Sequence, residues 1–141
     1  MSPVVRFADV ENLVKTWLLT TTVAPLVTVG TRVDIYFAMP TAAPIPSIVL
    51  SRAGGAPRRR SDLPEEVTRI SFDCWGTSRA QAGTICRALM AELDSLARIG
   101  PFITAGTLLA VGEVASVVWL PDPDSDRPRY IVDALVTTVS A

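Results

Sequence analysis

Histidine is absent from this chain of 141 residues, and with it the side chain that most often serves as general base near neutral pH. No G-x-S-x-G nucleophile motif is present, and Gly54-Gly55 is too short to cradle a phosphate. No cluster of cysteine and histidine ligands is present. These absences predict a protein that is not an enzyme and that carries no cofactor and no metal.

Charge is also scarce. Charged residues make up 19% of the chain and hydrophobic residues 49%, whereas about a quarter of the residues in soluble domains are charged. Such a composition tends to leave apolar surface exposed, which is typical of self-association, although an ordinary domain rich in alanine and valine also fits it. The net charge is −1, so no overall field draws the chain to nucleic acid or to an anionic membrane. Lys15 is the only lysine, and the other basic residues are arginines.

Cysteine and targeting signals are sparse as well. Cys74 and Cys86 match neither a metal site nor a C-x-x-C pair, so both are expected to be small core side chains. The N-terminus lacks the basic start and apolar core of a signal peptide. The apolar run 108–120 is interrupted by Gly112 and Glu113 and is shorter than the roughly 20 residues of a spanning helix. We therefore expect a soluble protein made in the cytoplasm.

The spacing of apolar residues indicates the first elements. Asp9 can cap a helix over residues 10–18, whose apolar residues repeat every three or four positions. Pro25 predicts that this helix has ended. Extended residues around 32–36 and over 45–52 predict strands, which a proline-rich connection joins.

The middle of the chain carries the clearest pattern. Residues 67–75 alternate between apolar and polar, which predicts a half-buried strand with Trp75 on its polar face. Gly76 predicts a sharp turn. A capping box at Ser78 then opens an amphipathic helix that runs to Leu96.

Two late strand-rich runs, residues 106–120 and 129–139, are joined by a polar, turn-rich segment, which is typical of an antiparallel pair. The order of elements predicts an α+β fold, with a mainly antiparallel sheet and two helices packed on one face. The length fits a single domain over residues 1–141. Segments at about 53–66 and 121–128 are expected to be mobile loops.

The first candidate contact site is the run Arg58, Arg59 and Arg60 within the 53–66 segment. Adjacent guanidinium groups can bind phosphate, or the carboxylates of a partner, bidentately. The acids that follow cancel most of that charge, and no aromatic residue is interleaved for base stacking. A solvated loop, a protein contact and a DNA contact all remain open.

The second candidate is the acidic series Asp122, Asp124 and Asp126. With Asp133 at the twelfth position, the series resembles a calcium loop. Such a loop needs glycine at the sixth position, which is Arg127 here. We therefore expect a solvated hairpin tip without metal, whose acids are candidates for protein contact.

The third candidate is Trp75. Tryptophan is favoured at interface hot spots, and the alternation places this ring away from the helix-covered face. The ring could equally fold over the end of the strand and cover the start of the next helix. Both interpretations remain open.

The layout of these segments resembles the tail terminator, or tail completion, proteins of long-tailed bacteriophages. The resemblance covers nearly the whole chain and rests on the order of its elements. These elements are the helix 9–18, the strand 45–52 after a proline-rich passage, the strand 70–75 after a charged loop, the capped helix 78–96, and Arg129-Tyr130 at the start of the last strand.

The resemblance implies an α+β fold that assembles into a ring, generally of six subunits, at the head-proximal end of a phage tail. Such a ring would cap the tail tube, end its polymerisation and present a surface to the head–tail connector. It implies a place in the virion, with further copies of the chain, the tube protein and the connector protein as partners, and with DNA near the lumen. The resemblance implies no catalytic residue and no membrane.

Two other functions fit the same residues. A small cytoplasmic regulatory or ligand-binding α+β domain that works as a dimer would hide apolar surface just as a ring does. A neighbouring head–tail connector subunit would share the size and composition of the chain. The particle mass in solution separates a ring from a stable dimer.

Overall fold

Strands and amphipathic helices account for most of the described chain. The computed structural model describes residues 7–38, 45–60, 63–104 and 106–140. Six strands form one sheet in the order β3-β4-β5-β8-β7-β6, while β1 and β2 pair separately. The elements are α1 (Val10–Leu18), α2 (Val23–Leu26), β1 (Thr28–Val29), β2 (Arg32–Val33), β3 (Ile35–Tyr36), β4 (Ser47–Arg60), β5 (Leu63–Trp75), α3 (Arg79–Ile99), β6 (Phe102–Thr104), β7 (Thr107–Trp119) and β8 (Arg129–Ser140).

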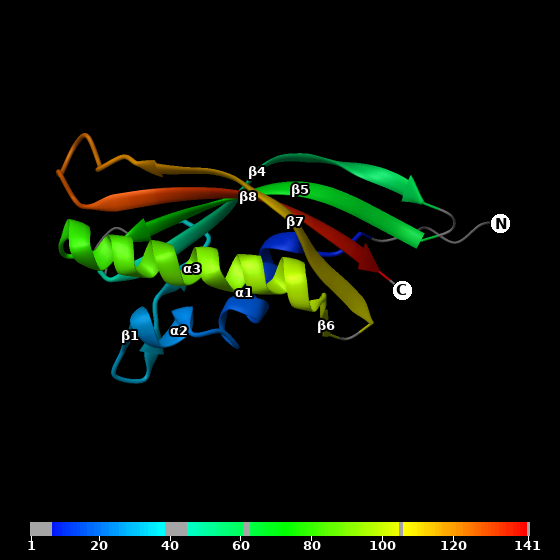
Figure 1. Ribbon diagram of the computed structural model, residues 1–141, viewed down its shortest axis with the longest axis horizontal. Coiled ribbons are helices and arrows are strands. Elements are labelled where there is room, and N and C mark those ends of the chain that lie inside the picture. The colour runs from blue at the N-terminus through cyan, green and yellow to red at the C-terminus, as the bar shows by residue number, and fades with distance from the viewer. Residues whose placement is uncertain (1–6, 39–44, 61–62, 105, 141) are drawn as a thin grey trace.

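The helices lie on one face of the six-stranded sheet, as Figure 1 shows. Neighbouring strands of this sheet are antiparallel, except that β3 runs parallel to β4. The expected α+β fold with a mainly antiparallel sheet is therefore confirmed. The short helix α2 is an addition that the sequence did not indicate. None of the helices within the described ranges is long and apolar enough to cross a membrane.

The first helix begins where the sequence places it. The Asp9 carboxylate accepts a hydrogen bond from the Asn12 amide at 3.2 Å, which satisfies one of the free N–H groups at the helix start. Pro25 follows the end of α1 as expected, but it lies inside α2. Proline is tolerated there because the amides of the first turn have no intrahelical acceptor.

The long helix α3 also starts with the expected cap. Ser78 Oγ accepts a hydrogen bond from the Gln81 amide at 3.1 Å. Gln81 Oε1 in turn accepts from the Thr77 amide at 2.6 Å, one residue further back than in a capping box. The helix buries one face, which consists of Ala82, Gly83, Ile85, Cys86, Leu89, Leu93 and Leu96.

The core lies between the helices and the sheet. Phe72 of β5 is fully buried, between its register neighbours Leu50 of β4 and Val132 of β8. Cys74 and Cys86 are buried as well, so the expectation that both are core side chains is confirmed. Burial raises the pKa of both thiols, because a thiolate is poorly solvated in the core.

The turn between β5 and α3 leaves no room for a side chain. A Cβ at Gly76 would lie 2.5 Å from the Ala82 nitrogen and 3.0 Å from the Ser78 carbonyl oxygen. The Gly76 amide donates to the carbonyl of Pro128 at 3.2 Å, which ties the turn to the start of β8. Glycine is therefore required here by the close approach of backbone to backbone.

Residues 53–60 and 63–66 are strand and not loop, contrary to the expectation from the polar composition of this segment. Residues 53–60 and 63–66 belong to β4 and β5, whose pairing continues to Arg60 opposite Leu63. Pairing between β5 and β8 extends as far as Glu65 opposite Val139. Pairing of the two strands with each other, together with the pairing of Glu65 and Glu66 with β8, outweighs the weak strand propensity of this segment.

Glycine makes the close pairing of this hairpin possible. Gly55 has a φ of +130°, and an added Cβ would lie 2.4 Å from the Val67 carbonyl oxygen. Residues 61–62 at the tip lie outside the described residues, as do residues 39–44 of the proline-rich connection. The mobility of the hairpin stays a prediction.

Both outer long strands are irregular at the same level of the sheet. The register of β4 shifts between Arg52 and Gly54, and that of β7 shifts twice between Val111 and Ser116. Both irregular stretches lie level with the same part of β5 and β8. Bulges bend a strand and increase the twist that every sheet has, and the sheet in Figure 1 is twisted.

Candidate contact surfaces

The face of the sheet opposite the helices is polar across its middle. Ser51, Ser71, Asp133 and Ser116 form one row across four strands. Asp133 Oδ2 binds Arg69 Nη2 at 3.0 Å and lies 3.4 Å from Ser116 Oγ. Its Oδ1 is buried and has no hydrogen-bond partner among the described residues.

Trp75 lies on this helix-free face, as its alternation with Cys74 predicts, but it is only 5% exposed. The guanidinium carbon of Arg129 lies 4.8 Å from the centroid of the Trp75 ring. Arg129 also donates from Nε to the Leu120 carbonyl at 2.9 Å and lies 3.5 Å from Asp73. The ring is therefore covered by its own chain, and its role in a contact with another protein stays a proposal.

Asp73 sits in an unfavourable environment for a carboxylate. Burial raises the pKa of Asp73, the nearby Arg129 opposes that rise, and the negative charge of Asp133 adds to it. The net effect is an upward shift, because the lost solvation outweighs the attraction to one guanidinium.

Replacement of Asp73 by asparagine is expected to change how stability depends on pH. The folded pKa of Asp73 exceeds its unfolded value of about 4. Its contribution to wild-type stability is therefore fully present below about pH 4 and is lost as the pH rises through the folded pKa. The free energy of unfolding of Asp73→Asn, minus that of the wild type, should rise from about pH 4 to about pH 7. Urea unfolding at both pH values measures this difference, and a fall would mean that attraction to Arg129 outweighs burial.

A second arginine–tryptophan stack lies at the same end of the sheet on its helix-covered face. The guanidinium carbon of Arg79 lies 4.6 Å from the Trp119 ring centroid, and the rings of Trp119 and Tyr130 are 4.9 Å apart. Arg79 Nε donates to the Tyr130 hydroxyl at 3.3 Å. Sequence reasoning missed this cluster, because its three residues come from α3, β7 and β8.

The acidic series forms the turn between β7 and β8. Asp122 accepts hydrogen bonds from the Asp124 amide at 3.1 Å and from Ser125 Oγ at 2.6 Å, which lower the pKa of Asp122. Its carbonyl accepts from the Asp126 amide at 2.9 Å. Asp122 therefore shapes the turn, whereas Asp124 and Asp126 are exposed.

The structure does not assemble this series into a metal site. Asp133, the twelfth residue of the calcium-loop pattern, lies in the middle of β8 and binds Arg69. Among the described residues, no group of three or more potential ligands could hold a metal ion.

Arg58, Arg59 and Arg60 lie near the tip of the β4–β5 hairpin, where they pair in register with Glu65, Pro64 and Leu63. Their side chains lie outside what the structure describes. This tip and the acidic turn are at opposite ends of the long axis of the molecule (Figure 1). The two charged segments singled out in the sequence therefore belong to two separate surfaces.

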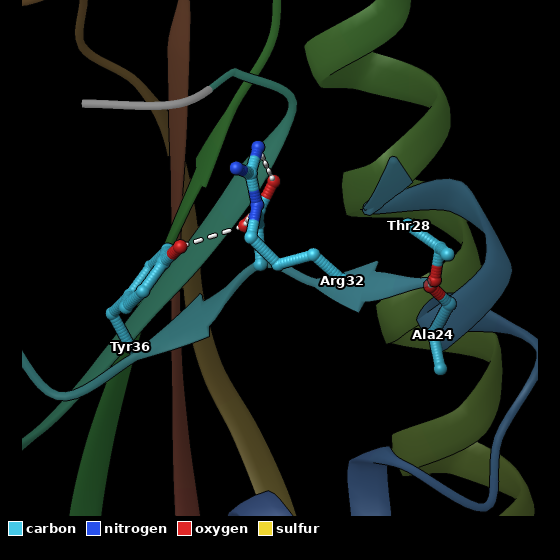
Figure 2. A network of polar contacts seen from close by, with 5 residues as sticks. Ala24, Thr28, Arg32 and Tyr36 are labelled. Carbon is cyan, nitrogen blue, oxygen red and sulfur yellow. Dashed lines mark hydrogen bonds and ion pairs between the residues drawn. The ribbon is translucent and has the colours of Figure 1, made fainter. Parts of the chain in front are cut away.

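A buried carboxylate that the sequence analysis missed anchors the strands before β4. Asp34 is fully buried, and its oxygens accept from Arg32 Nε at 2.7 Å and from the Tyr36 hydroxyl at 2.6 Å. Figure 2 shows both side chains reaching the same carboxylate. The hydrogen bond to Asp34 raises the pKa of Arg32 and of Tyr36. The Asp34 carbonyl also accepts from the Ile48 amide at 3.0 Å, so this network fixes the start of β4.

Apolar side chains are exposed along the β6–β7 side of the sheet. Ile99 is 81% exposed and Ile103 65% exposed, while Val117 and Val118 of β7 are 40% and 46% exposed. An open groove of about 240 Å³ lies beside Ile99, between the ends of α1, α3 and the start of β6. Exposed apolar surface of this kind is typical of protein contacts.

The fold has a counterpart among solved structures. A chain in the structure of the virion of a native gene transfer agent particle superposes with a TM-score of 0.58 and 17% sequence identity, covering 93% of this chain and 94% of the other. At that identity the similarity shows a shared fold. No protein-family model and no curated protein sequence matches the chain.

Proposed function

We propose that this chain is a structural protein of a virion. The observation that carries the proposal is the fold shared with a virion chain over 93% of this protein and 94% of its counterpart. A similarity that covers both chains almost end to end extends well beyond one common motif. The exposed apolar side chains of α3, β6 and β7 support a role in assembly.

Within the virion, the proposed role is that of a tail terminator. Copies of the chain, six in the resembled family, close into a ring at the head-proximal end of the tail tube. One face of the ring matches the tube, and the other face lacks the surface to which tube subunits add, so polymerisation ends there. A head-to-tail contact closes into a ring when its rotation permits, and this role requires no bond-making chemistry.

The two charged ends of the molecule suit different partners in this arrangement. The hairpin tip with Arg58, Arg59 and Arg60 and the turn with Asp122, Asp124 and Asp126 lie at opposite ends of the long axis (Figure 1). One end would meet the tube and the other the connector, with DNA passing near the lumen. Trp75 is proposed to stabilise the turn between β7 and β8 by stacking against Arg129.

Tube assembly in the presence of the purified chain tests the proposal. Cognate tube subunits are polymerised with and without the chain, and tube lengths and ends are scored by negative-stain electron microscopy. A tail terminator yields shorter tubes with an annulus at one end. A connector subunit would bind the connector and leave tube length unchanged, and a stable dimer without annuli would favour the regulatory domain.

A further inference from the structure

The central sheet has two long strand edges that nothing in the described chain covers. β3 pairs with β4 only at Ile48 and Val49, and β6 pairs with β7 only as far as Leu109. Beyond these short pairings, β4 and β7 each have a neighbouring strand on one side only. Free edges of this length present unpaired amides and carbonyls, which soluble proteins normally shield.

The hydrogen-bond pattern shows which amides point outward. Leu120 donates to the Arg129 carbonyl at 3.1 Å, and Trp119 lies opposite Tyr130. In an antiparallel ladder, amides alternate between the partner strand and the free side. The amides of Trp119 and Val117 therefore point away from β8.

The outer edge of β4 follows the same alternation. The Ile48 amide donates to Asp34, on the side away from β5, at 3.0 Å. Every second amide of β4 points to this side, so the amide of Arg52, four residues after Ile48, does so too. Arg52 lies beyond Val49, the last residue of β4 that pairs with β3. Both outer strands thus offer backbone groups for a further strand.

Geometry and charge match the two edges to each other. The four long strands β4, β5, β8 and β7 alternate in direction, so β4 of a second copy placed beside β7 continues the antiparallel pattern. β4 contains four arginines and no acid, and one of them, Arg52, is already paired with Glu66 of β5. β7 contains one acid, Glu113, and no base. A pair of β4 edges would bring like charges together, which is unfavourable.

Shape and apolar surface favour the same pairing. The irregular stretches of β4 and β7 lie at one level of the sheet, so both edges bend at that level. Val117 and Val118 project from opposite faces of β7 and are 40% and 46% exposed. A strand laid along this edge would cover both side chains.

We propose that β7 of one copy binds β4 of the next copy by strand addition, so that one antiparallel sheet runs from subunit to subunit. The contact is head-to-tail, because its two sides come from different strands, and it therefore builds rings and not two-fold dimers. This inference rests on the proposed ring and names the surfaces that form it.

Val117→Pro tests the contact at the backbone. Proline removes the outward amide of Val117 and leaves the β7–β8 ladder intact, since edge strands tolerate proline at such positions. We expect the variant to remain folded, as circular dichroism would show. Its association constant per contact should fall about tenfold or more. The matched control Val117→Thr keeps the amide and the branched shape and should form rings. Normal rings from folded Val117→Pro would overturn the inference.

Cross-linking between two variants that each carry one added cysteine gives a second test that does not depend on proline. Ser51→Cys on β4 and Val118→Cys on β7 lie on the helix-free face, and the native cysteines are buried. Mixed chains treated with a short bis-maleimide should give the heterotypic Ser51–Val118 product. Homotypic Val118 products, or rings without the heterotypic product, would overturn the inference and leave the proposed function standing. Absence of rings from the unmodified chain would overturn both.

Discussion

Replacement of Phe72 by alanine is expected to lower the free energy of unfolding by about 3–5 kcal/mol. Phe72 is fully buried at the centre of the sheet, with Leu50 and Val132 on the neighbouring strands and α3 above. Truncation removes the ring from the core and leaves a cavity that the surrounding strands cannot close. The loss is a large fraction of the stability of a single domain.

Urea unfolding followed by circular dichroism measures this loss. The matched control is Phe37→Ala, because Phe37 is 42% exposed and the Lys15 ammonium lies 5.3 Å from the centroid of its ring. The control should lose less than about 1 kcal/mol. Equal losses for the two variants would contradict the position assigned to Phe72. Since rings need folded subunits, Phe72→Ala should also yield fewer annuli on warming.

Replacement of Gly76 by alanine is expected to cost about 3 kcal/mol, the upper part of the range for added volume in a packed site. The new Cβ would lie 2.5 Å from the Ala82 nitrogen and 3.0 Å from the Ser78 oxygen, both backbone atoms that cannot rotate away. The first turn of α3 would have to move, and the hydrogen bond from Gly76 to Pro128 would weaken with it.

A second glycine in the same unit provides a control of opposite sign. A Cβ at Gly83, inside α3, would approach Arg87 Nη1 at 3.3 Å and Tyr130 Cε2 at 3.6 Å. The arginine side chain can move, and alanine is favoured over glycine within a helix by up to about 1 kcal/mol. Thermal or urea unfolding should therefore find Gly83→Ala slightly more stable than the wild type and Gly76→Ala much less stable. The same sign for both would contradict the geometry of the turn.

The sequence predicts the unit from β5 to α3 best, because local rules decide its structure. Alternation assigns the two faces of β5, and the polar residues around Ser78 start the helix. Gly76 marks the turn between them. Each of these signals acts over a few residues, so no knowledge of distant neighbours is needed.

The hairpin of residues 53–66 could not be predicted in the same way. Its glycines, prolines and charges are typical of loops, and part of its strand pairing, at Glu65 and Glu66, is with β8, which is remote in sequence. The stack of Arg129 on Trp75 and the burial of Asp34 likewise depend on contacts between elements. For the candidate surfaces, the sequence identified the charged segments but not their placement at opposite ends of the sheet.

The two arginine–tryptophan stacks give the molecule an intrinsic optical reporter. Two of its three tryptophans, Trp75 and Trp119, lie at the end of the sheet that carries the β7–β8 turn, and a guanidinium stacks on each ring. The third, Trp17, is buried on α1. Whatever docks on the turn and displaces either arginine must alter indole emission, so fluorescence of the unlabelled chain can follow engagement at this end of the molecule in real time.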